Sequence, residues 1–208
     1  MIQIIKVEII EKGKKKLVFD TGITCLLYRG EVRELKLEEN SYISLEQYEY
    51  ILKEIVGKRA KKRALYLLEQ MDRTEQQLRD KLLANGYPLQ CIEDAIAYVK
   101  SFHYLDDYRY ASTYIHYYQE KLSKQQLKQK LIIKGVPKDL AEQALEAEYV
   151  SDESEQIVQI LHKKKFEGVS KHSPEFRKMY QYLLRRGFSS SDILKEMNQK
   201  EKNFESET

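Results

Sequence analysis

The sequence predicts a mainly α protein: tandem three-helix repeats in an elongated, curved array, with a small β-containing N-terminal region. Only 8 Gly and 3 Pro occur among 208 residues, which leaves few obligatory turns and favours long helices. A set of residue types recurs at a nearly constant interval in the second part of the chain, as in helical repeat proteins. The first forty residues instead show the near alternation of apolar and polar side chains that is typical of strands.

Two strand pairs are predicted in those first forty residues. The strands are expected at residues 2–9, 17–19, 24–28 and 32–37. Lys12-Gly13-Lys14 supplies the turn of the first pair, and Arg29-Gly30-Glu31 joins the strands of the second. A sheet of this size is too small to be stable alone, so we expect it to pack on the first helix.

The first long helix is expected to begin at Ser44. Ser44-Leu45-Glu46-Gln47 fits a capping box, in which the serine side chain accepts a backbone N–H and Gln47 reaches back to the cap. Gly57 is expected to loosen this helix before the basic stretch that starts at Lys58. From there on the apolar spacing predicts helices throughout.

An internal repeat is the most informative feature of the sequence. Thr74-x-x-Gln77, Leu78, Leu82, Gly86, Pro88 and Ala95 recur 49 residues later as Ser123-x-x-Gln126, Leu127, Leu131, Gly135, Pro137 and Ala144. A weaker third copy begins at Ser173-Pro174 and contains Gly187. In each copy a capped helix is expected to end at the glycine, which adopts the left-handed conformation at little cost. Since one such unit cannot bury its apolar face fully alone, we expect neighbouring copies to stack.

These boundaries predict five segments. They are an N-terminal sheet-and-helix extension at 1–57, repeat 1 at 58–107, repeat 2 at 108–151, repeat 3 at 152–197 and a polar tail, expected to fray, at 198–208.

Composition restricts the location and chemistry of the protein. Cys25 and Cys91 lack CxxC spacing, which suits a reducing compartment, and no apolar run is long enough to span a membrane. The four histidines lack metal-ligand spacing, and no phosphate loop or nucleophile motif occurs. We therefore expect a cytoplasmic protein that is not an enzyme, with no cofactor, no metal, no small-molecule substrate and no membrane partner.

Two clusters that suggest chemistry have structural interpretations. Asp106 and Asp107 are adjacent, so on a helix their carboxylates diverge by roughly 100°, and their position before a helical run favours capping. Ser151-Asp152 is expected to occupy the same place one repeat later. The stripe Tyr110, Tyr114, Tyr117 and Tyr118 lies on one helix face and is more typical of a core than of a base-stacking platform.

A resemblance to a known family rests on residues 102–111, Phe-His-Tyr-Leu-Asp-Asp-Tyr-Arg-Tyr-Ala. This segment resembles the G-Y-L-D-D-x-x-[FY]-A stretch of the RecX family of RecA regulators. Residues 74–82 and 127–136 resemble two further stretches of that family, and the likeness extends over about 60–197. His103 departs from the family's glycine, and Ser123 stands where many members have glycine.

The resemblance implies a regulator that binds RecA–DNA filaments and modulates, mostly by inhibition, RecA ATPase and strand exchange in recombination, DNA repair and the SOS response. Its partners would be the RecA filament and DNA, reached directly or through RecA. The N-terminal extension is similar to that of Gram-positive members.

The basic residues of the repeats are the predicted contacts with such a partner. The net charge of +3 is uneven, because residues 58–191 carry an excess of about six cations. The candidates are Lys61, Lys62, Arg63, Arg79, Lys121, Lys124, Lys128, Lys134, Arg177, Arg185 and Arg186. For each of them a solvated helix face is an equal alternative. Two other functions stay open: a stand-alone helical nucleic-acid-binding module and a scaffold for an unrelated protein.

Overall fold

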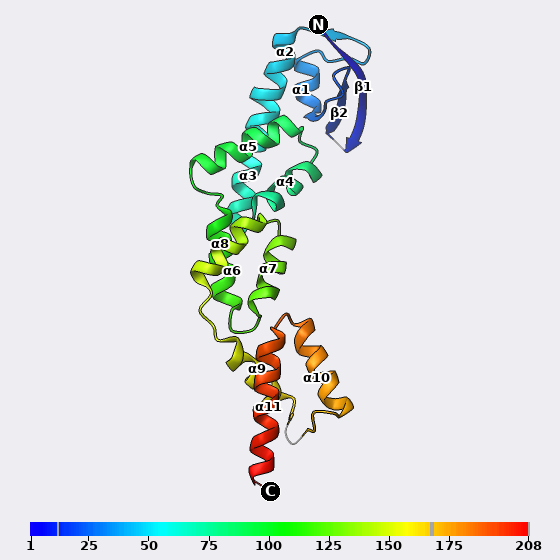
Figure 1. Cartoon of the computed structure of the whole chain (residues 1–208). Coiled ribbons are helices and arrows are strands. Elements are labelled where there is room, and N and C mark those ends of the chain that lie inside the picture. The colour runs from blue at the N-terminus through cyan, green and yellow to red at the C-terminus, as the bar shows by residue number, and fades with distance from the viewer. Residues whose placement is uncertain (12, 167–168, 208) are drawn as a thin grey trace. The chain divides into compact units, whose positions relative to one another are not determined.

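The computed structural model describes residues 1–11, 13–166 and 169–207. Its contacts divide the chain into two compact units, Met1–Asp107 and Tyr108–Thr208. The first unit contains the N-terminal sheet and the first repeat, and the second contains the two later repeats (Figure 1). The prediction of a mainly α protein with tandem three-helix repeats and a small N-terminal sheet is confirmed.

The sheet has the strand order β3-β2-β1-β4 and is antiparallel throughout. Its strands are β1 (Ile2–Glu11), β2 (Lys14–Phe19), β3 (Thr24–Tyr28) and β4 (Tyr42–Ile43). Ile4, Leu17, Phe19 and Leu27 are fully buried, as expected where alternate side chains point to one face. Lys12, part of the predicted first turn, lies outside the described residues.

The predicted strand at 32–37 is wrong. Residues Arg29–Glu34 form helix α1, and β4 supplies the fourth strand. The Glu31 carboxylate accepts the backbone N–H of Tyr28 at 2.7 Å, which caps the helix. Val32 and Leu37 are buried in the same apolar cluster as Leu17 and Leu27 of the sheet. The apolar residues of so short a segment fit both the helical and the strand period, and the cap at Tyr28 favours the helix.

A long helical segment follows the sheet as α2 (Leu45–Tyr50), η1 (Ile51–Gly57) and α3 (Lys58–Gln70). Ser44 Oγ accepts the N–H of Gln47 at 3.0 Å, which confirms the predicted start. The Gln47 side chain does not reach back to the cap, however. It donates to the carbonyl of Leu35 at 3.0 Å and so ties the helix to the segment after α1.

Gly57 does not interrupt this helix, and the loosening that we expected before the basic stretch takes the form of π-helical hydrogen bonding. Gly57 ends η1, a stretch of π-helix whose backbone passes directly into α3. A Cβ added to Gly57 would lie 2.9 Å from the carbonyl oxygen of Leu52. The wide turn therefore brings the two backbones too close for a side chain, and glycine allows this approach.

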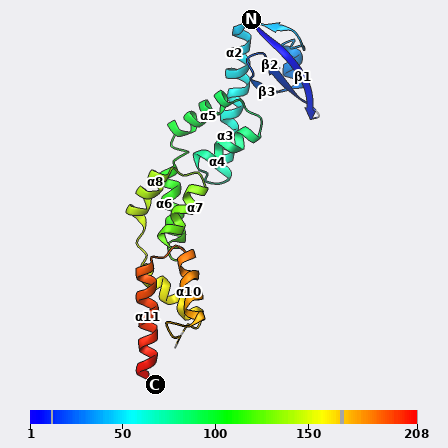
Figure 2. The same ribbon diagram turned by 45° about the vertical axis from the view of Figure 1, so that its right-hand side comes forward.

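The remaining helices form the repeats. They are α4 (Glu75–Ala84), α5 (Leu89–Ser101), α6 (Asp107–Tyr118), α7 (Lys124–Ile133), α8 (Lys138–Glu148), α9 (Glu153–Lys163), α10 (Pro174–Arg185) and α11 (Ser190–Glu207). Repeat 1 comprises α3 to α5, repeat 2 α6 to α8, and repeat 3 α9 to α11 (Figure 2). The backbone of the expected polar tail continues α11 as far as Glu207. None of the helices described is long and apolar enough to cross a membrane.

The glycine turn is the common element of the three repeats, as predicted. Gly86, Gly135 and Gly187 have φ of 79°, 92° and 81°. The residue after each glycine donates its N–H to the carbonyl five residues earlier: Tyr87 to Leu82, Val136 to Leu131 and Phe188 to Leu183 at 3.3, 3.0 and 3.4 Å. This bonding satisfies helix-end carbonyls and directs the chain into the next helix.

The repeats bury their apolar residues in different ways. The sheet and repeat 1 share one cluster, which includes Phe19, Leu27, Leu78 and Ile92. Repeats 2 and 3 each have a cluster of their own, around Leu127 and around Leu183. Three helices therefore close a core by themselves in the second unit, which differs from our expectation that burial needs stacked copies.

We predict that Gly57→Ala lowers the free energy of unfolding by about 1 to 3 kcal/mol, because the new methyl group would press on the Leu52 carbonyl. This loss opposes the gain of about 1 kcal/mol that alanine normally brings to a helix interior. Gly30→Ala is the matched control, since its Cβ would meet nothing within 4 Å. Urea denaturation followed by circular dichroism measures both, and equal stability of Gly57→Ala and the parent would contradict the prediction.

Candidate partner-binding surface

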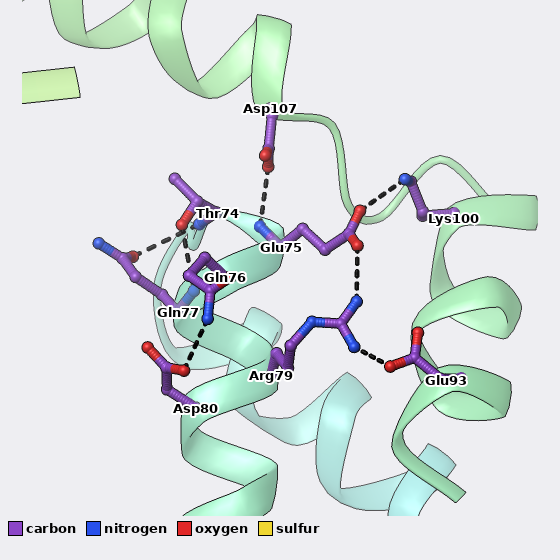
Figure 3. A network of polar contacts seen from close by, with 9 residues as sticks. All are labelled: Thr74, Glu75, Gln76, Gln77, Arg79, Asp80, Glu93, Lys100 and Asp107. Carbon is purple, nitrogen blue, oxygen red and sulfur yellow. Dashed lines mark hydrogen bonds and ion pairs between the residues drawn. The ribbon is translucent and has the colours of Figure 1, made fainter. Parts of the chain in front are cut away.

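Asp107 accepts a hydrogen bond at the start of another helix. Its carboxylate accepts the backbone N–H of Glu75, the first residue of α4, at 2.8 Å (Figure 3). Burial raises the pKa of Asp107, and this hydrogen bond acts in the opposite direction. Asp107 thus caps a helix, as predicted. The helix that it caps is α4, whereas the sequence had suggested the helix that Asp107 itself begins, α6.

The same helix start holds a network of ion pairs (Figure 3). Glu75 contacts Lys100 at 2.6 Å and Arg79 at 2.8 Å, and Arg79 also pairs with Glu93 on α5. The hydrogen bond from Lys100, and to a smaller extent that from Arg79, holds the pKa of Glu75 below its usual value. Thr74 completes the cap by accepting the N–H of Gln77 at 3.2 Å. The network thus joins α4 to α5.

The second unit repeats this arrangement. The Glu153 carboxylate accepts the N–H of Lys124, the first residue of α7, at 2.6 Å. Glu153, not Asp152, is therefore the counterpart of Asp107, and the predicted pairing with Ser151-Asp152 is displaced by one residue. Asp152 instead caps its own helix by accepting the N–H of Ser154 at 2.8 Å.

Arg79 and Lys128, two of the predicted binding residues, have equivalent structural roles. Arg79 pairs with Glu93 between α4 and α5, and Lys128 pairs with Glu142 between α7 and α8 at 2.5 Å. Lys128 lies 49 residues after Arg79, and Glu142 lies 49 residues after Glu93, so both members of the pair recur at the repeat offset. Lys128 is therefore paired with a carboxylate of the chain itself.

Arg186 attaches the third repeat to the second. Its guanidinium donates to the carbonyl of Lys121 at 2.9 Å, and its own carbonyl accepts the hydroxyl of Ser123 at 2.6 Å. A Cβ on the adjacent Gly187 would lie 3.0 Å from that same hydroxyl oxygen. Arg186 thus stabilises a close contact between the glycine turn of repeat 3 and the start of α7.

Several other predicted residues lie against aromatic rings. The Nζ atoms of Lys61, Lys121 and Lys134 lie 5.3, 5.5 and 5.2 Å from the ring centroids of Tyr98, Tyr117 and Tyr114. Arg63 donates from Nε to Asn85 at 2.9 Å and lies 5.2 Å from the Tyr66 ring. Such contacts hold a cation over the face of a ring.

The remaining four candidates are Lys62, Lys124, Arg177 and Arg185. They are exposed and form no ion pair, side-chain hydrogen bond or ring contact within the described part of the chain. One lies on repeat 1, one on repeat 2 and two on repeat 3. These four are the best candidates for contact with an anionic partner.

The tyrosine stripe of α6 is mostly structural. Tyr110, Tyr114 and Tyr118 are half-buried against the core of repeat 2, with ring centroids 6.4 and 4.5 Å apart along the series. Tyr117 differs, because 69% of its surface is exposed. The predicted core role therefore holds for three members, while the fourth lies on the surface beside Lys121.

An exposed aromatic cluster that the sequence did not predict lies at the end of α5. Tyr98 and Phe102 meet edge to face at 5.0 Å, and Phe102 stacks on Tyr104 at 6.2 Å. Between them His103 has a φ of 57°, the conformation for which glycine is favoured. The departure from the family glycine at His103 was the available indication of an unusual turn here.

The fold and these contacts define a class of protein: tandem three-helix domains in which many of the charged side chains connect helices. Among the residues described, no group of three His, Cys, Asp or Glu is placed to hold a metal ion. Family models for the first, second and third three-helix domains of RecX match residues 60–99, 106–145 and 152–196. The chain belongs to the RecX family.

Individual relatives agree with this assignment. The chain is 33% identical over 191 residues to the regulatory protein RecX of Caldanaerobacter subterraneus subsp. tengcongensis, covering 90% of this chain and 94% of that protein. It is 33% identical to RecX of Clostridium botulinum strain Eklund 17B, over 68% of each chain. A crystal structure of a regulatory protein RecX is similar in fold, with a TM-score of 0.63, 21% identity and coverage of 95% and 100%. The crystal structure of RecX from Lactobacillus salivarius is also similar, with a TM-score of 0.62 and 24% identity, and the match covers 71% of this chain and 97% of that one.

We predict that Glu75→Gln lowers the free energy of unfolding by about 1 kcal/mol at pH 7, because it removes the charge shared by Lys100 and Arg79. The pKa of Glu75 is lower in the folded chain than its ordinary value of 4.5. The stability that Glu75 contributes is therefore complete above pH 4.5 and is lost as the pH falls through the pKa of the folded state. The difference between parent and variant should therefore shrink in acid. Urea denaturation at pH 7 and pH 3.5 tests this, with the exposed Glu69→Gln as control; a difference that persists in acid would contradict it.

Proposed function

We propose that this protein is a non-enzymatic cytoplasmic regulator that binds RecA–DNA filaments and inhibits RecA ATPase and strand exchange. The observation that carries the proposal is the match of a RecX domain model to each of the three repeats. The curated relatives bear the name regulatory protein, which agrees with such a role. DNA is reached directly or through RecA.

The distribution of cations supports a partner that is itself repetitive. Lys62, Lys124 and the pair Arg177 and Arg185 place unengaged positive charge on each repeat. Individually weak contacts add when they are linked in one chain, because each bound repeat raises the effective concentration of the next. We propose that the segments 58–107, 108–151 and 152–197 act as successive contact modules of this kind, with 1–57 as an accessory domain and 198–208 as a tail.

We predict that substoichiometric protein lowers the DNA-dependent ATP hydrolysis of RecA, measured by phosphate release. The triple variant Lys124→Glu, Arg177→Glu and Arg185→Glu should need at least about tenfold more protein for the same effect, because like charges at an anionic surface weaken binding. Lys53→Glu is the control, since Lys53 lies on η1, outside the repeats, and pairs with Glu49. Unchanged RecA turnover at equimolar parent protein would contradict the proposal.

A second candidate is a stand-alone nucleic-acid-binding module. It is favoured by the cations beside tyrosines in repeat 2, Lys121 with the exposed Tyr117 and Lys134 with Tyr114. Basic and aromatic side chains together bind single strands through phosphates and stacked bases.

Salt dependence separates the two candidates. If phosphates are bound directly, the logarithm of the affinity for duplex DNA should fall with that of the salt concentration, with a slope of about 0.9 per phosphate contact, in the absence of RecA. Fluorescence anisotropy of a labelled duplex measures this. Binding detected only when RecA is present would reject the stand-alone module and favour the filament regulator.

A further inference from the structure

A cavity of about 590 Å³ lies in the first unit, between the end of strand β3 and the glycine turn of repeat 1. Its wall contains Lys14 of β2, Tyr28 of β3, Arg59 and Arg63 of α3, and Tyr87 of the turn. Volumes of about 300 to 1,000 Å³ are usual for small-ligand sites. The cavity is formed jointly by the N-terminal sheet and the first repeat, and Arg63 is the one residue of its described lining that is also a predicted partner contact.

The wall of this cavity is positively charged. Three cations line it, and no described Asp or Glu belongs to the lining. The carboxylate of Glu31 pairs with Arg59, whereas the Arg63 guanidinium forms no ion pair within the described part of the chain. A cavity of one sign with apolar walls concentrates its field and attracts ions of the opposite sign.

Arg59 is held rigidly in place. Its Nη1 donates to the Leu26 carbonyl at 3.0 Å, its Nη2 pairs with Glu31, and its guanidinium lies 4.4 Å from the centre of the Tyr28 ring. The ring and the cation therefore present one fixed, flat surface at the cavity. A preorganised surface of this kind binds a ligand with little loss of side-chain freedom.

Arg63 has donors to spare. Its Nε donates to Asn85, but its two Nη groups make no hydrogen bond within the described part of the chain. Burial raises the pKa of Tyr87, while Arg59, Arg63 and Lys14 oppose that shift. All three cations line the cavity together with Tyr87.

We propose that this cavity binds the phosphate of a nucleotide, with the Arg63 guanidinium facing the phosphate and the Tyr28 and Tyr87 rings facing the base. A phosphate monoester carries a charge between about −1.5 and −2 and three acceptor oxygens, which the two Nη groups of a guanidinium can bind together. The aromatic and apolar part of the wall suits a flat base. The ligand is bound and not turned over.

The nucleotide has two possible sources, a free mononucleotide and a residue of a nucleic acid strand. An acidic peptide is a different class of ligand and is the rival explanation of a basic cavity. The proposal is independent of RecA, so it can fail while the regulatory function stands, and the reverse also holds.

Isothermal titration calorimetry of the full chain tests the proposal with adenosine 5′-monophosphate, adenosine, a decathymidylate and a hexaglutamate peptide. We expect adenosine 5′-monophosphate to bind and adenosine to bind at least about tenfold more weakly, because a charge-assisted hydrogen bond is lost. Decathymidylate binding tighter than the mononucleotide identifies a nucleic acid as the source, and weaker binding identifies a free nucleotide. Hexaglutamate binding tighter than both nucleotide ligands would overturn the proposal.

Variants locate the binding in this cavity. Arg63→Gln should weaken adenosine 5′-monophosphate binding about tenfold, Arg63→Lys should retain part of it, and Lys53→Gln, which removes an exposed cation elsewhere in the same unit, should leave it unchanged. An unchanged urea midpoint confirms that the variants are folded. No binding by the parent at millimolar ligand, or equal binding by Arg63→Gln and Lys53→Gln, would overturn the proposal.

Discussion

The structure depends on how each repeat satisfies the polar groups at the ends of its second helix. An α-helix leaves four N–H groups and four carbonyl groups without partners at its ends. At the start of α4 and α7, Thr74 and Ser123 cap the helix and a carboxylate from Asp107 or Glu153 accepts a further N–H. At the other end, a glycine with positive φ closes the carbonyls and directs the chain into the next helix. These contacts fix the angle between helices, and the apolar residues fill the space so defined.

This constraint also decides which charges are available for function. Arg79 and Lys128 connect the second and third helices of their repeats, and Arg186 holds the turn of repeat 3 against repeat 2. Their removal would alter the fold as well as any surface. Lys62 and Lys124, which support no other helix, carry charge that a partner can use. The same residue type in the same repeat thus serves either stability or binding, according to whether an acid lies on the neighbouring helix.

The N-terminal sheet is more than an appendage to the helices. It shares its apolar cluster with repeat 1, and Leu26 packs so closely on the turn at Gly86 that an added Cβ would lie 2.9 Å from its side chain. Arg59 bonds to the edge of β3, where it occupies the Leu26 carbonyl that another strand would otherwise use. The basic cavity arises at this junction, and neither the sheet nor the repeat would form it alone.

The sequence by itself determined the helical repeats, because their caps and turns are local. Ser123, Gly135 and Pro137 act through bonds to residues a few positions away, and their recurrence could be read directly. It did not determine the helix at Arg29–Glu34, because the few apolar residues there fit both the helical and the strand period. It also did not determine the π-helix that ends at Gly57, which depends on the close approach of the Leu52 carbonyl. Nor did it separate Lys124 from Lys128, since the difference lies in Glu142, which only the packing of α7 on α8 brings close. Local hydrogen bonds can be predicted because they join residues that are close in the sequence, whereas charge pairs between helices depend on the tertiary structure.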